Sequence, residues 1–253
     1  MYGAERQQLL AQQVRTDGRI DVTATSEQLG VAPETIRRDL AALERQGLVR
    51  RVYGGAILLE RLDFEPAVNE RDRTRSAEKD RIARAALDLV PQRGTVLFDA
   101  GTTSSRLAAL LPQGRDLTIV TNSLPVASQL ATRTDVTVHM LGGRIRPATL
   151  ATVESWALHV LAGLTVDIGF FGTNGFSAAR GCTTPDTAES AVKAAMVGAC
   201  RRRVLLSDHS KYGDDQFARF ATLGEIDVVV TDSGLDEQAV AELNEAAIEV
   251  VLA

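Results

Sequence analysis

Apolar positions near the N-terminus of the chain follow the period of an α-helix. Between residues 31 and 48 the apolar side chains lie three and four positions apart. They are Ile36, Leu40 and Leu43. Pro33 suits the first position of a helix because its missing N–H would be unpaired there, and Gly47 is a typical C-terminal stop. The pattern therefore predicts an amphipathic helix with one buried stripe.

The polar side of this helix carries residues that suit contact with DNA. Thr35, Arg37 and Arg38 lie off the apolar stripe and near the N-terminus of the predicted helix. A recognition helix meets base edges with its N-terminal residues, and a guanidinium bonds guanine in bidentate fashion in the major groove. An ordinary amphipathic surface helix has the same pattern, so the neighbouring segments must decide between the two interpretations.

The neighbouring segments complete a winged helix-turn-helix. A helical pattern covers residues 5–15, and a short helix is predicted within residues 21–30. Residues 48–58 form two β-type runs around a glycine pair, which is typical of a tight hairpin and predicts a wing. Backbone phosphates fix the register of a protein on DNA without reading its sequence. The wing residues expected to reach them are Arg50, Arg51 and Tyr53.

Beyond residue 75 the pattern changes to alternating strands and helices. Residues 59–75 are rich in charge and have little periodicity, which indicates a linker. The β-branched or apolar runs that follow are mostly separated by helical segments and cover residues 95–98, 117–120, 136–141, 167–171, 203–206, 227–230 and 248–251. This alternation predicts an α/β domain with a mainly parallel sheet over residues 76–253, joined to a mostly α-helical domain over residues 1–58.

The loop after the first predicted strand carries candidate binding residues. Ligands of open parallel sheets bind beyond the carboxyl ends of the strands, and Asp99 lies directly after this strand. Gly101 lets the backbone approach a ligand, while Thr102 and Thr103 offer hydroxyl and N–H groups at a helix N-terminus. This arrangement is typical of a phosphate seat, although similar turns also serve simply to cap helices.

Four further polar loops are expected to end later strands at the same edge of the sheet. Their candidate residues are Thr121, Asn122, Gly143, Arg144, Asn174, Asp208 and Lys211. Asn and Gly also occur in turns for conformational reasons, and an exposed Lys is usually just solvated. Glu189 and Lys193 lie four positions apart on one predicted helix, so they most simply form a surface ion pair. The rival interpretation points both side chains into the ligand site.

The segment Glu34–Ala56 carries a specific motif. It reads E-T-I-R-R-D-L-x-x-L-E-x-Q-G-L-x-R-R-V-x-G-G-A and resembles the DNA-binding signature of the DeoR family of bacterial sugar-metabolism regulators. Ala32 stands where the family usually has a Ser N-cap, a loss of about 1 kcal/mol for the helix. Tyr53 stands where the family usually has His. Neither departure removes a base-reading group.

The strand-end loops are similar to the effector domain of the same family, with the patterns D-x-G-T-T, V-T-N-S, L-G-G-x-x-R, G-x-N-G, T-x-x-x-x-E-x-x-V-K and D-x-S-K. The resemblance implies a fold similar to ribose 5-phosphate isomerase and a bound sugar phosphate. The candidate effector-binding residues are Asp99, Gly101, Thr102, Thr103, Thr121, Asn122, Gly143, Arg144, Asn174, Glu189, Lys193, Asp208 and Lys211. Glu154 stands where the family commonly has Gly, and its charge would weaken anion binding unless Arg144 or Arg146 neutralises it.

Composition adds limits to this picture. The 253 residues are 45% hydrophobic and 24% charged, as in ordinary soluble globular proteins, and the apolar runs are too short to span a bilayer. The N-terminus lacks the pattern of a secretory signal, so we expect a cytoplasmic protein. Cys182 and Cys200 have no metal-ligand spacing, so no metal, disulfide or cofactor is expected.

Charge bears on how DNA is bound. The net charge is −5, and arginines balance acids in the first sixty residues, so DNA affinity must come from local placement and from dimerisation. We therefore expect a homo-oligomer, a dimer at minimum.

The expected function is a transcriptional regulator, a repressor of sugar-metabolism genes that a phosphorylated sugar releases from operator DNA. It is not expected to be an enzyme. One alternative is a sugar-phosphate isomerase-like enzyme with a DNA-binding appendage, whose candidate bases are Asp99, Glu189 and Asp208. Another is a DNA-binding protein whose second domain only mediates oligomerisation.

Overall fold

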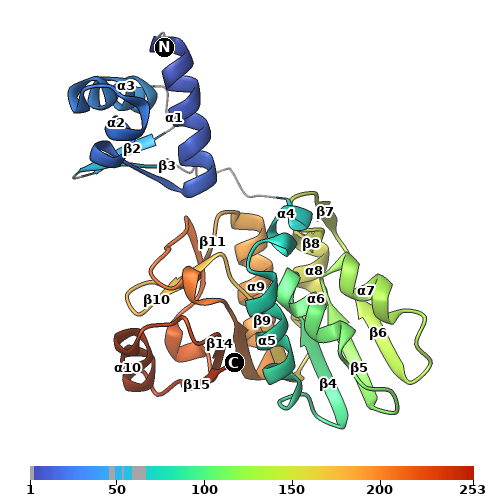
Figure 1. Cartoon of the computed structure of the whole chain (residues 1–253). Coiled ribbons are helices and arrows are strands. Elements are labelled where there is room, and N and C mark those ends of the chain that lie inside the picture. The colour runs from blue at the N-terminus through green and yellow to red at the C-terminus, as the bar shows by residue number, and fades with distance from the viewer. Residues whose placement is uncertain (1–2, 46–48, 53, 59–66) are drawn as a thin grey trace. The chain divides into compact units, whose positions relative to one another are not determined.

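The computed structural model describes residues 3–45, 49–52, 54–58 and 67–253. The chain divides into two compact units, Met1–Phe64 and Glu65–Ala253 (Figure 1). The predicted helix stop Gly47 and the predicted wing residue Tyr53 lie outside the described residues. Within the described ranges, no helix is both long enough and apolar enough to cross a membrane.

The first unit is a winged helix-turn-helix, as predicted. Its elements are α1 (Gly3–Asp17), β1 (Arg19–Asp21), α2 (Val22–Leu29), α3 (Pro33–Arg45), β2 (Val49–Val52) and β3 (Gly55–Leu58), and the strands form an antiparallel sheet in the order β1-β3-β2. The Asp21 carboxylate accepts a hydrogen bond from the Ala24 N–H (2.9 Å) and caps α2, which ends at Gly30 in the left-handed region (φ 63°). The stripe of α3 is buried in this unit's core with Leu10 and Val14 of α1.

The second unit contains a sheet of seven strands, all parallel, in the order β15-β14-β12-β9-β4-β5-β6. These strands correspond to the seven runs expected from the sequence. They are β4 (Arg93–Phe98), β5 (Asp116–Thr121), β6 (Val136–Met140), β9 (Val166–Gly172), β12 (Cys200–Leu206), β14 (Val228–Thr231) and β15 (Glu249–Leu252).

Two small antiparallel pieces were not predicted. One is the hairpin of β7 (Arg144–Arg146) and β8 (Ala151–Val153), and the other joins β10 (Gly175–Ser177), β11 (Gly181–Thr184) and β13 (Ala218–Ala221). Strands of three or four residues are too short for alternation of apolar and polar positions to distinguish them from loops.

Helices cover both faces of the sheet (Figure 1). One hydrophobic cluster contains side chains of α5 (Ser76–Leu87), α6 (Thr102–Ala109) and α7 (Leu124–Leu130), and includes the stacked rings of Phe98 and Phe170. The other contains side chains of α8 (Ser155–Leu161), α9 (Thr187–Ala199) and α10 (Glu237–Glu245), together with Leu97 and Phe171. Because neighbouring strand residues point to opposite faces, the two clusters form two cores, one on each side of the sheet.

A helix of the second unit, α4 (Val68–Arg73), lies inside the stretch 59–75 that the sequence assigned to a linker. None of its residues is buried. Hydrophobic periodicity therefore gave no sign of this helix, which polar contacts hold in place.

The carboxyl ends of β5, β4, β9 and β12 are neighbours at one edge of the sheet. Phe98 is in register with Thr121 and Phe170, and Leu206 is in register with Gly172. The loops that follow these strands therefore open on one side, and they include the short 3-10 helix η1 (His209–Lys211) after β12.

Candidate functional site

Helix α3 separates buried from outward-facing side chains. Ile36, Leu40 and Leu43 are at most 2% exposed, whereas Arg37 and Arg38 are exposed and Thr35 is half-buried. The Arg37 guanidinium lies 3.1 Å from the Glu34 carboxylate on the exposed surface, where such a pair is worth little. The side chains proposed to read bases are thus displayed on the surface of the unit.

Asp39 has a role that the sequence analysis missed. Its carboxylate is buried and accepts hydrogen bonds from Arg6 (2.5 Å) and Gln7 (3.0 Å) of α1. The residues of the R-R-D motif therefore have different roles: Arg37 and Arg38 face outward, and Asp39 joins α3 to α1 by hydrogen bonds. An acidic residue between a positive surface and an apolar stripe is the only sequence signal for this contact.

The wing contains an ion pair with α3. Arg51 is exposed, and its Nε and backbone N–H donate to the Glu44 carboxylate at 2.8 and 2.9 Å. These hydrogen bonds lower the pKa of Glu44. A phosphate would have to compete with Glu44 for the Arg51 guanidinium, while Arg50 lies on the same strand, β2.

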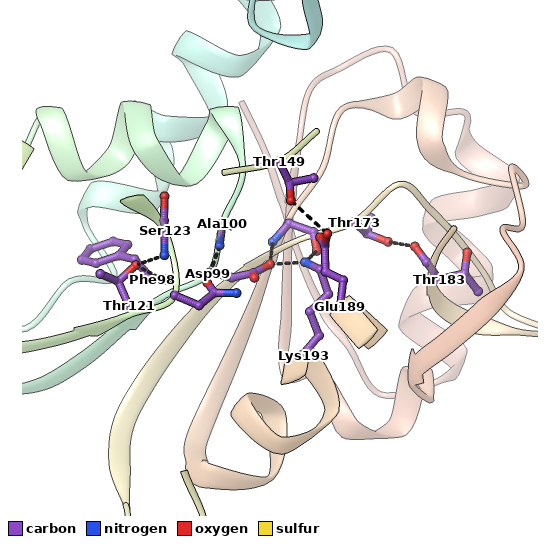
Figure 2. A network of polar contacts seen from close by, with 12 residues as sticks. Phe98, Asp99, Ala100, Thr121, Ser123, Thr149, Thr173, Thr183, Glu189 and Lys193 are labelled. Carbon is purple, nitrogen blue, oxygen red and sulfur yellow. Dashed lines mark hydrogen bonds and ion pairs between the residues drawn. The ribbon is translucent and has the colours of Figure 1, made fainter. Parts of the chain in front are cut away.

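Asp99 and Lys193 form a buried ion pair at the centre of the second unit's loop edge (Figure 2). The Asp99 carboxylate also accepts from the Gly172 N–H (3.0 Å), and the Lys193 ammonium also donates to the Gly172 carbonyl (3.0 Å). The ammonium lies 5.0 Å from the centre of the Phe220 ring. Lys193 is therefore committed to Asp99, and its charge is already neutralised.

The loops after β4 and β5 are joined by side-chain hydrogen bonds. Asn122 Oδ1 accepts from the Ala100 N–H (2.9 Å), and the Thr121 hydroxyl donates to the Phe98 carbonyl (2.7 Å). Figure 2 shows Thr121, at the end of β5, beside Phe98 at the end of β4. Five buried side-chain polar atoms have no hydrogen-bond partner among the described residues, and three of them lie here: Asp99 Oδ1, Asn122 Nδ2 and Ser104 Oγ. Buried polar atoms left unpaired are costly, so these groups call for a further partner.

The N-terminus of α6 follows directly. Thr102 and Thr103 are buried in its first turn, and no side chain caps the helix. Gly101 is extended (φ 167°), and a Cβ added there would meet its nearest atoms only at 3.8 and 4.0 Å. Protein packing therefore leaves space at Gly101. By contrast, Gly143 has φ 130°, and a Cβ there would lie 2.2 Å from the Val153 carbonyl oxygen, so the β7–β8 hairpin itself requires this glycine.

Glu189 and Lys193 do not form the surface ion pair that their spacing most simply predicts. Both side chains are buried, and they have different partners. The Glu189 carboxylate accepts from Arg146 and from the Thr149 hydroxyl, each at 3.1 Å. The surface-pair interpretation is therefore wrong, because packing of α9 against the sheet turns this helix face inward.

An ion pair joins Arg144 of the β7–β8 hairpin to Glu154, which directly follows β8. Arg144 Nε lies 2.6 Å from the Glu154 carboxylate, so Arg144 neutralises the acidic residue that stands where glycine was expected. Glu154 has φ 81° and ψ −166°, a conformation that is essentially restricted to glycine. Beside it, Trp156 is 73% exposed and packs over Gly142.

The loop after β12 lies next to α4 and α5. The Asp208 carboxylate accepts from the backbone and hydroxyl of Ser210 and lies 3.6 Å from Arg75 Nε. Lys79 of α5 is buried, and its ammonium donates to the carbonyls of Arg71 and Thr74. The pKa of Lys79 is lowered to about 8, chiefly by burial and with help from the positive charges of Arg71 and Lys211, while the carboxylates of Asp208 and Asp72 oppose the shift.

The sequence analysis did not select Arg75 or Lys79. A signal for Lys79 existed, because it precedes Ile82, Ala83 and Ala86 by three, four and seven positions and so lies on the apolar stripe of α5. Asn174, which was selected, is half-buried and donates its backbone N–H to the Thr183 carbonyl (3.2 Å). In the part of the chain that the structure describes, no group of His, Cys, Asp and Glu could hold a metal ion.

Taken together, a helix-turn-helix unit and an α/β unit with a polar site at its strand ends define a DNA-binding regulator with a sensor domain. Residues 6–61 match the model of the DeoR-like helix-turn-helix domain, and residues 74–233 match that of the DeoR C terminal sensor domain. The chain belongs to the DeoR family of transcriptional regulators.

Named relatives agree in length as well as sequence. The HTH-type transcriptional regulator GlpR of Haloferax volcanii is 35% identical over 252 residues, which cover 99% of this chain and 98% of the relative. The glycerol-3-phosphate regulon repressor of Escherichia coli K12 is 30% identical over 233 residues, 92% of each chain. Ribose 5 phosphate isomerase A from Neisseria gonorrhoeae aligns over 53% of this chain and 52% of its own, with a TM-score of 0.39 and 19% identity.

Proposed function

We propose that the protein represses genes of sugar or sugar-derivative metabolism and that a phosphorylated sugar releases it from its operator. The names of the relatives support the first part, because one represses a glycerol-3-phosphate regulon. The second part is carried by one observation, the buried and unpaired atoms Asp99 Oδ1, Asn122 Nδ2 and Ser104 Oγ beside the uncapped N-terminus of α6.

The chemistry of these groups matches a phosphorylated polyol. A carboxylate oxygen accepts from a ligand hydroxyl, the amide of Asn122 donates to one, and the hydroxyl of Ser104 does either. The N–H groups at the start of α6 and the positive charge of Lys211 favour a phosphate. One ligand with both hydroxyl and phosphate groups would satisfy the whole set.

An enzymatic role has less support, because each candidate base is engaged. Asp99 pairs with Lys193, Glu189 accepts from Arg146 and Thr149, and Asp208 accepts from Ser210. A general base must be able to reach and take a substrate proton. Carboxylates held in this way position a ligand better than they abstract a proton, which favours a sensor.

On the DNA side, we propose that Thr35, Arg37 and Arg38 meet base edges and that Arg50, Arg51 and Tyr53 reach phosphates. A single winged module without a basic tail makes few phosphate contacts, so a homodimer assembled through the second unit is proposed to bind a symmetric operator. Light scattering at micromolar concentration tests this assembly, and a monomer even with DNA present would contradict it.

The decisive experiment compares matched sugars with and without phosphate. Ligand at a hundredfold its dissociation constant is expected to stabilise the second unit by about 2.7 kcal/mol, a shift of several degrees in melting temperature. Lys211→Ala combined with Thr102→Val should abolish the shift and keep the variant on DNA whatever sugar phosphate is added. Thr137→Val on the exposed edge strand β6, combined with Arg84→Ala on α5, serves as the matched control.

Three outcomes would overturn the proposal. Equal shifts in melting temperature with and without phosphate would contradict the assignment of the phosphate-binding residues. No shift with any sugar would indicate that the second unit only mediates oligomerisation. Turnover of a sugar phosphate into product would instead establish the isomerase-like alternative.

A further inference from the structure

The chain contains only three lysines among its 28 basic residues, and two of them, Lys193 and Lys211, are candidate effector-binding residues. Lys193 is neutralised by the buried carboxylate of Asp99. Lys211 lies in η1, directly after β12. Lys79 lies on α5, outside the strand-end loops, so the proposed effector site does not by itself explain its position.

The position of the Lys79 ammonium is unusual. Its side chain is buried, and Nζ donates to the carbonyls of Arg71 and Thr74, the latter at 2.8 Å. These carbonyls belong to the last turn and the C-terminal cap of α4. An ammonium has three N–H donors, so these two bonds leave one donor for a further partner.

Charged groups of both signs surround this ammonium. The groups that face it are the carboxylates of Asp208 and Asp72 and the cations of Lys211 and Arg71. Asp208 is already engaged by Ser210 and by the nearby Arg75, and Asp72 accepts from Arg106 of α6 (2.8 Å). Lys79 is buried and Lys211 is half-buried, and the positive charge of both would attract an anion.

Two cations, Arg106 and Lys79, hold helix α4 against the rest of the second unit. Arg106 Nη2 donates to the carboxylate and to the backbone carbonyl (2.9 Å) of Asp72, while Lys79 holds the last carbonyls of the helix. No side chain of α4 is buried. Arg106 lies one turn along α6 from the proposed phosphate seat, so one of the two anchors of α4 belongs to an element that forms the site.

We infer that Lys79 is the residue through which an anionic effector acts on α4. The inference rests on the proposed phosphorylated effector and adds how its binding is transmitted. The anion accepts the third N–H of the ammonium and favours its charged form, so the bonds to the carbonyls of Arg71 and Thr74 strengthen. Effector binding therefore tightens α4, the first helix after the segment that joins the two units.

The test uses the full chain labelled with ¹⁵N-lysine, which gives one side-chain ammonium signal for each of three lysines. Inorganic phosphate is titrated against chloride at equal ionic strength, and Lys79→Arg and Lys211→Arg assign the signals. The expected result is that phosphate shifts the signals of both Lys79 and Lys211 with one dissociation constant. Hydrogen exchange of the α4 amides, residues 68–73, is expected to slow severalfold at saturation.

A matched pair of variants separates the role of Lys79 from general charge. Lys79→Gln should bind phosphate about tenfold to hundredfold more weakly, because one charge-assisted hydrogen bond is lost, and its α4 exchange should no longer respond. Arg84→Gln removes one positive charge from the exposed face of α5 and should behave like the wild type. Lys79→Arg keeps the charge and should retain binding, which keeps the test valid if Lys79→Gln folds poorly.

The outcomes distinguish the two levels of the proposal. A shift of the Lys211 signal without a shift of the Lys79 signal, or wild-type binding by Lys79→Gln, would overturn the role of Lys79 and leave the effector proposal standing. Phosphate binding with unchanged α4 exchange would overturn the transmission step. No response of either lysine to phosphate or to sugar phosphates would overturn the effector proposal and this inference together.

Discussion

The buried ion pair of Asp99 and Lys193 makes a quantitative prediction about stability. Lys193→Met leaves the Asp99 carboxylate, which is 0% exposed, with the Gly172 N–H as its remaining partner. Removing one member of a buried pair costs about 3 to 5 kcal/mol. For a unit of this size about 1 kcal/mol corresponds to 2–4 °C in melting temperature, so a loss on the order of 6–20 °C is expected.

The assay is a double-mutant cycle. Asp99→Asn should be similarly costly because it leaves the Lys193 ammonium buried beside a neutral amide, and the double variant should recover at least about 2 kcal/mol relative to the sum. Denaturant unfolding of the four proteins gives the interaction free energy. If the two substitutions add within about 0.5 kcal/mol, Lys193 is not committed to Asp99 and is available to a ligand.

Three further predictions follow from other sites. Glu154→Gly should be more stable than Glu154→Ala by about 1 to 2 kcal/mol, because both lose the exposed pair with Arg144 but only glycine relieves the backbone at φ 81°; equal unfolding free energies would contradict this. Phosphate affinity should fall as the pH rises through about 8, where the Lys79 ammonium loses its proton. The Lys79→Arg variant should show no such fall between about pH 7 and 9, and calorimetric titration of both proteins with phosphate tests this difference. Arg37→Ala or Arg38→Ala should reduce discrimination between a selected operator and random DNA by about 1 to 3 kcal/mol, and unchanged specificity in both variants would refute their role in base reading.

The architecture of both units was predictable because it depends on local patterns. The stripe of Ile36, Leu40 and Leu43 placed α3, and Pro33 marked its first residue. The strands of the large sheet are buried on both faces, so they read as short apolar runs separated by helices. Such signals lie within a few residues of one another and need no knowledge of the fold.

The partners of the site residues were not predictable in the same way. Glu189 and Lys193 share a helix face, yet each pairs with a residue from a distant element, Arg146 and Asp99. Spacing shows that two side chains share a face but not whether that face is turned to solvent or to the sheet. The simplest local interpretation was therefore wrong, although both residues had been selected as candidates.

Helix α4 and Lys79 were missed for related reasons. α4 buries no side chain, so it leaves no hydrophobic period, and polar contacts from Lys79 and Arg106 hold it. A lysine on the apolar stripe of a helix is the sequence signal for such a contact. The sequence contains that signal at Lys79, beside Ile82 and Ala83, but only the fold shows which carbonyls it meets.

The long separation of Asp99 from its partner has a consequence for biosynthesis. The strand that places Asp99 needs β9 as a neighbour, and Lys193 follows Asp99 by 94 positions. Domains fold as units in the order in which they leave the ribosome, and parallel pairing of distant strands is slow. The helix-turn-helix unit therefore folds on a nascent chain before the sensor can close its sheet. Asp99 and Lys193 can therefore meet only after α9 has been synthesised, so the second unit, and the dimer proposed to form through it, is completed last.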